Sequence, residues 1–216
     1  MSGVIRCIAL ALGAVIAQTA DAGMRLMPEA IIDWQAHSFA GETDYALTET
    51  SHGTAVRAVC ENGTASGLVY TDGVDLSETP VIEWRWRVVD AVETGDPRRQ
   101  SGDDYAARLY AVDEHAILRW RTRAINYVSS TRARPGAQWP NAFAGQAQMV
   151  VVDSLDGSRT GKESWRVHRR NLREDFARLH DRSIDRIDAL ALMTDCDNTG
   201  DRAEALYGTI RLLPES

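Results

Sequence analysis

From Ile31 onward the chain alternates short runs rich in β-branched and aromatic residues with breaks rich in glycine, proline or polar residues. Long helical periodicity is scarce, so the pattern predicts an all-β fold, a sandwich of two packed antiparallel sheets. Strands are expected at residues 31–39, 43–50, 55–60, 65–70, 80–89, 105–112, 117–127, 148–153, 163–168, 187–194 and 207–213.

The breaks between these runs carry turn signals. Ala40-Gly41-Glu42, Ser51-His52-Gly53 and Glu61-Asn62-Gly63 predict a meander of hairpins in the first third of the chain. One short helix is expected at about 171–180, where Asn171 and Glu174 resemble a capping box. Two connections, 90–104 and 129–147, are longer than usual, and loops of this length tend to be mobile or to form a binding site.

Residues 1–22 have the organisation of a secretion signal peptide. Arg6 supplies the positive charge, residues 7–17 are apolar, and Ala20-Asp21-Ala22 fits the A-x-A cleavage pattern. A buried N-terminal helix is the alternative. The expected mature protein is a single β-sandwich domain, 23–216, located in the periplasm or secreted, with no later segment apolar enough to span a bilayer.

Two cysteines, Cys60 and Cys196, remain after the predicted cleavage. An exported protein meets an oxidising compartment, so the two could form a disulfide, worth about 4–5 kcal/mol in the chain-entropy model. Two separate buried thiols explain the residues equally well.

The net charge of −7 argues against nucleic acid as a partner, because nucleic-acid binding needs a concentrated positive surface. Lys162 is the only lysine, so nearly all cationic side chains are arginines. Guanidinium groups match carboxylates and sulfates by paired hydrogen bonds, which an ammonium group does not do.

Two predicted strands carry rows of arginine. In the first, Arg85 and Arg87 alternate with Trp84 and Trp86, which are expected to line the core, with a sugar-stacking platform as the alternative. In the second, arginines recur at every other position from 119 to 123. If both rows share one sheet face, they form a cationic groove for an acidic glycan; otherwise each pairs with neighbouring carboxylates.

A third strand and one loop supply further candidate ligand-binding residues. Alternation places Asp104, Arg108 and Tyr110 on one face, with Asp104 and Arg108 too far apart to pair along the strand, so each needs a partner from elsewhere. Trp139 lies in a loop without periodicity, where it either stacks on a ligand or packs back onto the sandwich.

An acidic loop after the last but one predicted strand suggests a cation. Asp195, Asp197, Asn198 and Asp201 bring oxygen ligands of the kind that Ca²⁺ prefers, and Asp103 with Asp104 could join them. The likeness to a helix-loop-helix calcium loop is partial, because Leu206 stands where a bidentate Glu would be needed.

The chain lacks the sequence motifs of serine hydrolases, nucleotide-binding loops and zinc proteases. His168 is the best candidate for a general base, with Tyr110 or Tyr127 as the acid of a polysaccharide lyase. Nothing in the spacing requires this chemistry, so a binding protein is favoured over an enzyme.

After the signal, the chain resembles the domain of unknown function 3047 family of exported bacterial proteins, which implies export, a single domain and no assigned activity. The resemblance rests on Trp84-Arg85-Trp86-Arg87-Val88, Asp103-Asp104-Tyr105-Ala106-Ala107-Arg108-Leu109-Tyr110, Asn126-Tyr127, Trp165, Arg170-Asn171-Leu172, Asp175-Phe176, Met193-Thr194-Asp195-Cys196-Asp197-Asn198-Thr199 and Tyr207-Gly208-Thr209-Ile210.

Cys196 and Thr209 depart from the family pattern, where Thr and Asp are expected. The first departure allows the Cys60 bridge, and the second removes a carboxylate from any metal site. The closing Tyr-Gly-x-Ile pattern is also similar to the end of galactose-binding-like jelly rolls, a likeness of fold rather than of function.

These observations lead to one main functional hypothesis, an exported carbohydrate-binding β-sandwich with Ca²⁺ as its candidate cofactor. An envelope protein that binds another protein is the alternative, and a polysaccharide lyase or hydrolase comes third.

Overall fold

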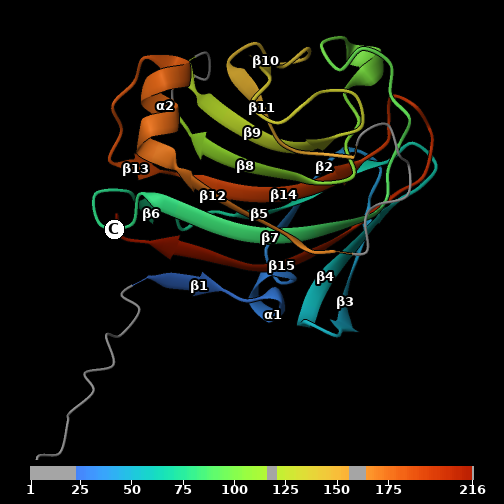
Figure 1. Cartoon of the computed structure of the whole chain (residues 1–216), viewed down its shortest axis with the longest axis horizontal. Helices are drawn as coiled ribbons and strands as arrows, with labels where there is room; N and C mark the ends of the chain where they lie inside the picture. The colour runs from blue at the N-terminus through green and yellow to red at the C-terminus, as the bar shows by residue number, and fades with distance from the viewer. Residues whose placement is uncertain (1–22, 116–120, 156–163, 216) are drawn as a thin grey trace, which may run out of the picture.

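The computed structural model describes residues 23–115, 121–155 and 164–215, which form two large β-sheets (Figure 1). Sheet A has the strand order β12 (Arg166–Asn171), β7 (Val81–Asp90), β15 (Ala203–Leu213), β4 (Gly53–Cys60), β3 (Asp44–Thr50), with β1 (Met24–Leu26) also paired to β15. Sheet B has the order β10 (Gln138–Pro140), β11 (Ala147–Ser154), β9 (Arg123–Ser130), β8 (Arg108–Asp113), β14 (Ala189–Asp195), β5 (Ala65–Tyr70), β2 (Gln35–Ala40). The predicted two-sheet sandwich of the jelly-roll kind is confirmed.

One strand pair departs from the expected antiparallel pattern, because β11 runs parallel to β9. The connection 131–146 contains β10, which runs antiparallel to β11. The chain therefore returns along the sheet before β11 begins, and β11 starts at the same end as β9.

The expected meander is only partly correct. The turn at Ser51-His52-Gly53 joins β3 to β4 as a hairpin within sheet A. By contrast, the turn at Asn62 and Gly63 carries the chain from β4 in sheet A to β5 in sheet B. Both residues have positive φ, at 57° and 72°, a backbone that asparagine and glycine tolerate best. A turn signal predicts reversal of the chain, but the pairing of its flanking strands depends on distant partners.

The core lies between the sheets, as the tryptophan alternation predicted. Trp84 and Trp86 are buried, and their rings pack against Tyr127 of sheet B and His168 of β12. The alternate residues Arg85 and Arg87 therefore lie on the outer face of sheet A.

Helix α2 (Leu172–His180) lies beside β12 and β9 at one end of the sandwich (Figure 1). The Asn171 side chain accepts a hydrogen bond from the Glu174 backbone N–H at 3.3 Å, which confirms the predicted N-terminal cap. Leu172 and Phe176 are buried, so the helix covers core surface that the strands leave open.

Several short elements were not predicted. They are α1 (Pro28–Ile31), the 3-10 helix η1 (Gln100–Gly102), β1, β10, and the two-stranded sheet of β6 (Val74–Asp75) with β13 (Arg186–Ile187). The strand expected from residue 31 begins only at Gln35, because Pro28 opens a helical turn there. Elements of two to four residues are too short for a periodic signal.

Cys60 at the end of β4 and Cys196 directly after β14 form a disulfide, which decides between the two alternatives left open by the sequence. The bridge joins sheet A to sheet B. The predicted signal peptide lies outside the described residues. Within the described ranges, helices are too short or too polar to cross a bilayer.

Candidate functional site

A cleft of about 480 Å³ opens on the outer face of sheet B. Leu109 and Ala111 of β8 point into the core, so the alternate residues Arg108 and Tyr110 face outward into the cleft. Strand register places Arg108 beside Met193 of β14, and Tyr110 beside Asn126 of β9. The cleft floor is thus built from three adjacent strands.

Arg108 and Asp195 form a buried ion pair in this floor, with side chains 3% and 2% exposed. The Arg108 Nε donates to Asp195 Oδ1 at 2.7 Å, and one terminal nitrogen donates to Oδ2. The Tyr105 backbone N–H also donates to Oδ1, at 3.1 Å. Burial raises the pKa of Asp195 above its ordinary value, and the guanidinium opposes that rise. The pair supplies a fixed polar floor without net charge.

The two acidic loops meet beside this pair, as the sequence predicted. Asp104 accepts hydrogen bonds from the backbone N–H groups of Asn198 at 3.1 Å and Thr199 at 2.7 Å, and from Asn198 Nδ2 at 2.9 Å. Carboxylate oxygens of Asp104, Asp195 and Asp197 lie within 4.8 Å of one another, the spacing of a possible cation site. Asp201 is not part of this group.

Two residues that line the cleft each have a buried acceptor oxygen without a hydrogen-bond partner among the described residues: Asn126 Oδ1 and Asp103 Oδ1. Asn126 is 1% exposed and Asp103 is 5% exposed. The other Asp103 oxygen accepts from Asn141 Nδ2 at 2.9 Å. Because buried polar atoms are costly when unpaired, these two oxygens favour a ligand that donates hydrogen bonds.

Two exposed phenylalanines stand at the rim of the cleft: Phe39 is 68% exposed and Phe143 is 57% exposed. Phe39 lies at a register shift of β2, and such a bulge re-aims a side chain. Asn141 Oδ1 accepts from the backbone N–H groups of Phe143 and Ala144, at 2.9 Å each, and this turn presents Phe143. Both phenyl rings offer apolar faces beside a polar floor.

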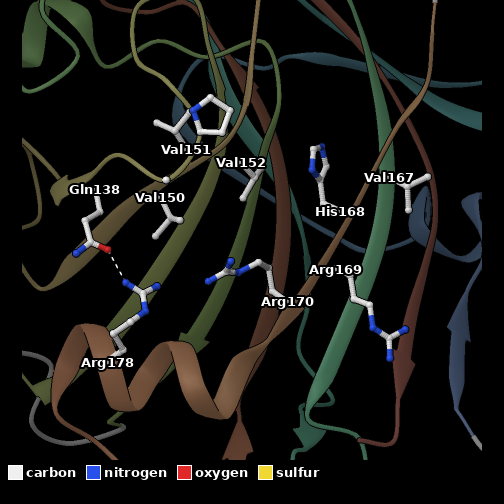
Figure 2. A pocket seen from close by; sticks show the side chains of 11 residues that line it. Gln138, Val150, Val151, Val152, Val167, His168, Arg169, Arg170 and Arg178 are labelled. Carbon is white, nitrogen blue, oxygen red and sulfur yellow. Dashed lines mark hydrogen bonds between the residues drawn. The ribbon is translucent and has the colours of Figure 1, made fainter. Parts of the chain in front are cut away.

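A second cavity, of about 520 Å³, opens between β11, β12 and α2 (Figure 2). His168 lines it, whereas Tyr110 lies in the cleft on the outer face of sheet B. The Tyr127 hydroxyl donates to Asp175 at 2.7 Å, and its ring is fully buried. The structure therefore does not bring His168 and Tyr110 together as the base and acid of a lyase.

Other predicted ligand-binding residues lie away from the cleft. Trp139 is only 5% exposed and packs with Tyr105, Val128, Met149 and Val151 in a second small core, so its ring cannot stack on a ligand. The loop that holds it folds back onto sheet B, a long-range contact that local sequence does not reveal.

The structure also excludes the alternative in which the arginine rows share one face and form a cationic groove. Arg85 and Arg87 belong to sheet A, while Arg123 begins β9 in sheet B, and Arg121 precedes that strand. Arg119 lies outside the described residues. Arg85 and Arg87 therefore share no sheet face with Arg123.

Phe39, Phe143 and Asn126 were missed as site residues. Each lies in a segment expected to be a strand or a long loop. The exposure of the two phenylalanines and the unpaired oxygen of Asn126 follow from tertiary packing. The length of the loop 129–147 was the one available signal, since Asn141 and Phe143 lie in it.

Comparison with solved structures finds carbohydrate-binding modules among the similar chains. A family 11 carbohydrate-binding module from Clostridium thermocellum, in complex with a β-1,3-1,4-mixed-linked tetrasaccharide, is 14% identical and covers 89% of this chain and 95% of its own, with a TM-score of 0.47. A family 30 carbohydrate-binding module of a cellulosomal cellulase from the same organism is 10% identical and covers 85% and 91%, with a TM-score of 0.48. At these scores the likeness does not extend to function.

No curated protein sequence matches the chain. The family described as "Protein of unknown function (DUF3047)" matches residues 32–211, which include all of sheet B, most of sheet A, the cleft and the disulfide. The chain therefore belongs to the DUF3047 family.

Proposed function

We propose that this protein binds a neutral carbohydrate in the cleft on the outer face of sheet B. The observation that carries the proposal is the pairing of two buried, unpartnered acceptor oxygens with two exposed phenyl rings around one cleft. Sugar rings combine hydroxyl donors with apolar C–H faces, so they match both features at once. The volume of about 480 Å³ lies within the usual range for ligand sites.

A neutral ligand is favoured over an acid because the cleft lining carries three carboxylates, Asp103, Asp195 and Asp197, and one guanidinium, Arg108. Repulsion by these carboxylates disfavours an anionic ligand. The Arg108 guanidinium donates hydrogen bonds to Asp195 and to the Asp103 carbonyl. Its other terminal nitrogen donates to the Tyr110 hydroxyl at 3.2 Å. Binding an acid there would require breaking a buried ion pair, which costs several kcal/mol.

Affinity electrophoresis through gels containing neutral polysaccharides tests the proposal. The wild-type protein should be retarded by at least one polymer. Phe39→Ala and Phe143→Ala should each weaken binding about two- to tenfold, since an aromatic contact contributes about 0.5–1.5 kcal/mol beyond its buried area. Leu47→Ala, at an exposed apolar position on sheet A, should leave retardation unchanged.

Absence of retardation by every polymer, or retardation that survives both phenylalanine substitutions, would contradict carbohydrate binding at this cleft. Capture of a periplasmic protein that depends on the same two phenylalanines would instead support the envelope-protein alternative.

We also propose export to the periplasm or the medium, because the Cys60–Cys196 disulfide needs an oxidising compartment. Fractionation of cells producing the full chain, followed by mass determination of the mature N-terminus, tests this. Recovery of the uncleaved chain in the cytosol would contradict it.

Calcium binding stays a prediction centred on Asp197, the exposed member of the three-carboxylate group. Burial raises the pKa of Asp197, and the neighbouring Asp104 carboxylate raises it further by repulsion that a cation there would offset. Calcium at about ten times its Kd should raise the melting temperature by about 3–5 °C. Asp197→Asn should remove the increase and Asp201→Asn should not, whereas equal melting curves with chelator and calcium would exclude the site.

A further inference from the structure

The second cavity lies at an open edge of the sandwich. One wall is β12, the terminal strand of sheet A, and the other is the core-facing side of β11, with α2 at the bottom (Figure 2). Val150 and Val152 contribute an apolar wall, while His168, Arg170 and Arg178 contribute polar groups. This cavity opens between the sheets, whereas the carbohydrate cleft lies on the outer face of sheet B.

The charge that faces this cavity is positive. Its lining includes three arginines and no carboxylate among the described residues. Arg169 is turned to the other side of β12, where it pairs with Glu83 at 3.5 Å. Arg170 and Arg178 are therefore the two guanidinium groups of the lining that face the cavity (Figure 2).

One carboxylate, Asp175 of α2, holds both groups in place. Asp175 accepts hydrogen bonds from Nε and a terminal nitrogen of Arg170 and from a terminal nitrogen of Arg178, the last at 2.7 Å. It also accepts a hydrogen bond from the Tyr127 hydroxyl. Burial alone would raise the pKa of Asp175, but these hydrogen bonds outweigh burial and hold it below its ordinary value. Two cations against one anion leave one positive charge at the cavity floor.

Both arginines keep donors to spare. A guanidinium has five N–H donors. Arg170 uses two of them on Asp175, and Arg178 uses one on Asp175 and one on Gln138 Oε1 at 2.5 Å. Among the described residues these contacts leave donors unused on both guanidinium groups, and the side chains are 35% and 46% exposed. Pre-positioned guanidinium donors bind oxyanions in a paired geometry that water does not reproduce.

We propose that this cavity is a second binding site, specific for a small organic carboxylate of monosaccharide size. Its carboxylate would accept hydrogen bonds from Arg170 and Arg178, and its body would lie against Val150 and Val152. The volume of about 520 Å³ lies in the usual range for small-molecule sites and has room for one sugar ring.

Isothermal titration of the mature protein with D-glucuronate, and with D-glucose as the uncharged counterpart, tests the proposal. Glucuronate should bind and glucose should not, and affinity should fall as salt is raised. Arg178→Gln should weaken glucuronate binding about tenfold or more, because one charge-assisted hydrogen-bonded contact is lost. Arg178→Lys, which keeps the charge but not the fork, should recover part of the loss.

Arg173→Gln is the matched control, because Arg173 lies on the same helix and pairs with the exposed Asp185 instead of facing the cavity. An equal loss of affinity in Arg173→Gln would show only a general effect of charge and overturn the site. Absence of glucuronate binding, or binding unchanged in Arg178→Gln with a wild-type melting temperature, would overturn it as well. Phe39→Ala should leave this binding intact, which separates the site from the carbohydrate cleft.

Discussion

At the scale of single residues, Arg108 organises the candidate cleft. Its guanidinium lies over the Tyr105 ring at 4.5 Å, binds Asp195 through two hydrogen bonds, and reaches the carbonyl of Asp103. These contacts join β8, β14 and the loop before β8 at one point. An arginine that is only 2% exposed is rare in proteins unless its donors have hydrogen-bond partners. Most of the Arg108 donors have such partners here.

Arg108→Met should therefore destabilise the protein by about 3–5 kcal/mol, because Asp195 would remain buried without its cation. The double variant Arg108→Met with Asp195→Leu should lose much less. Urea denaturation at pH 7 measures both, with Arg173→Met as a surface control expected to cost less than about 1 kcal/mol. A small loss in the single variant, comparable with that control, would show that the pair is not held as described.

His168 predicts how stability depends on pH. Burial against Trp84 and Trp86 lowers its pKa to about 4, and Arg166 acts in the same direction while Asp153 opposes it. A folded-state pKa below the unfolded value of about 6.5 means that the folded state favours the neutral ring. The resulting stability is complete above pH 6.5 and is lost as the pH falls toward 4.

Between pH 7 and pH 4.5, the wild-type protein should lose about 2–3 kcal/mol more stability than His168→Gln, whose side chain does not titrate. Urea denaturation at the two pH values measures the difference. Equal losses in both proteins would show that His168 titrates normally.

At the scale of elements, the disulfide joins the ends of β4 and β14, which belong to different sheets. The bridge lies next to the acidic corner, because Asp195 directly precedes Cys196 and Asp197 follows it. The cleft floor and the covalent link between the sheets thus meet at the end of one strand.

Because the cysteines are 136 positions apart in the sequence, the chain-entropy model gives the bridge about 5 kcal/mol of stability. Reduction should lower the urea midpoint accordingly. The double variant Cys60→Ala with Cys196→Ala should resemble the reduced protein and should not respond to reductant. A wild-type midpoint that is unchanged by complete reduction would contradict a stabilising role.

At the scale of the whole molecule, one sandwich presents two separate cavities of different character. The cleft on sheet B has an excess of carboxylates and lies between phenyl rings, whereas the edge cavity has an excess of positive charge. Their separation predicts independent binding, so each set of variants should affect one ligand class only.

The local pattern of the sequence determined which side chains share a face of each strand. Alternation in β7 placed Trp84 and Trp86 in the core, and alternation in β8 placed Arg108 beside Tyr110, because side-chain direction along a strand depends only on its neighbours in the chain. The same local signals predicted the cap of α2 at Asn171.

Only the tertiary structure decided which strands are neighbours. It placed Arg85 and Arg87 in a different sheet from Arg123, buried Trp139, paired Cys60 with Cys196, and set Phe39 and Phe143 around the cleft. These outcomes depend on contacts between residues far apart in sequence, and turn and periodicity signals carry no information about which distant strand will pair.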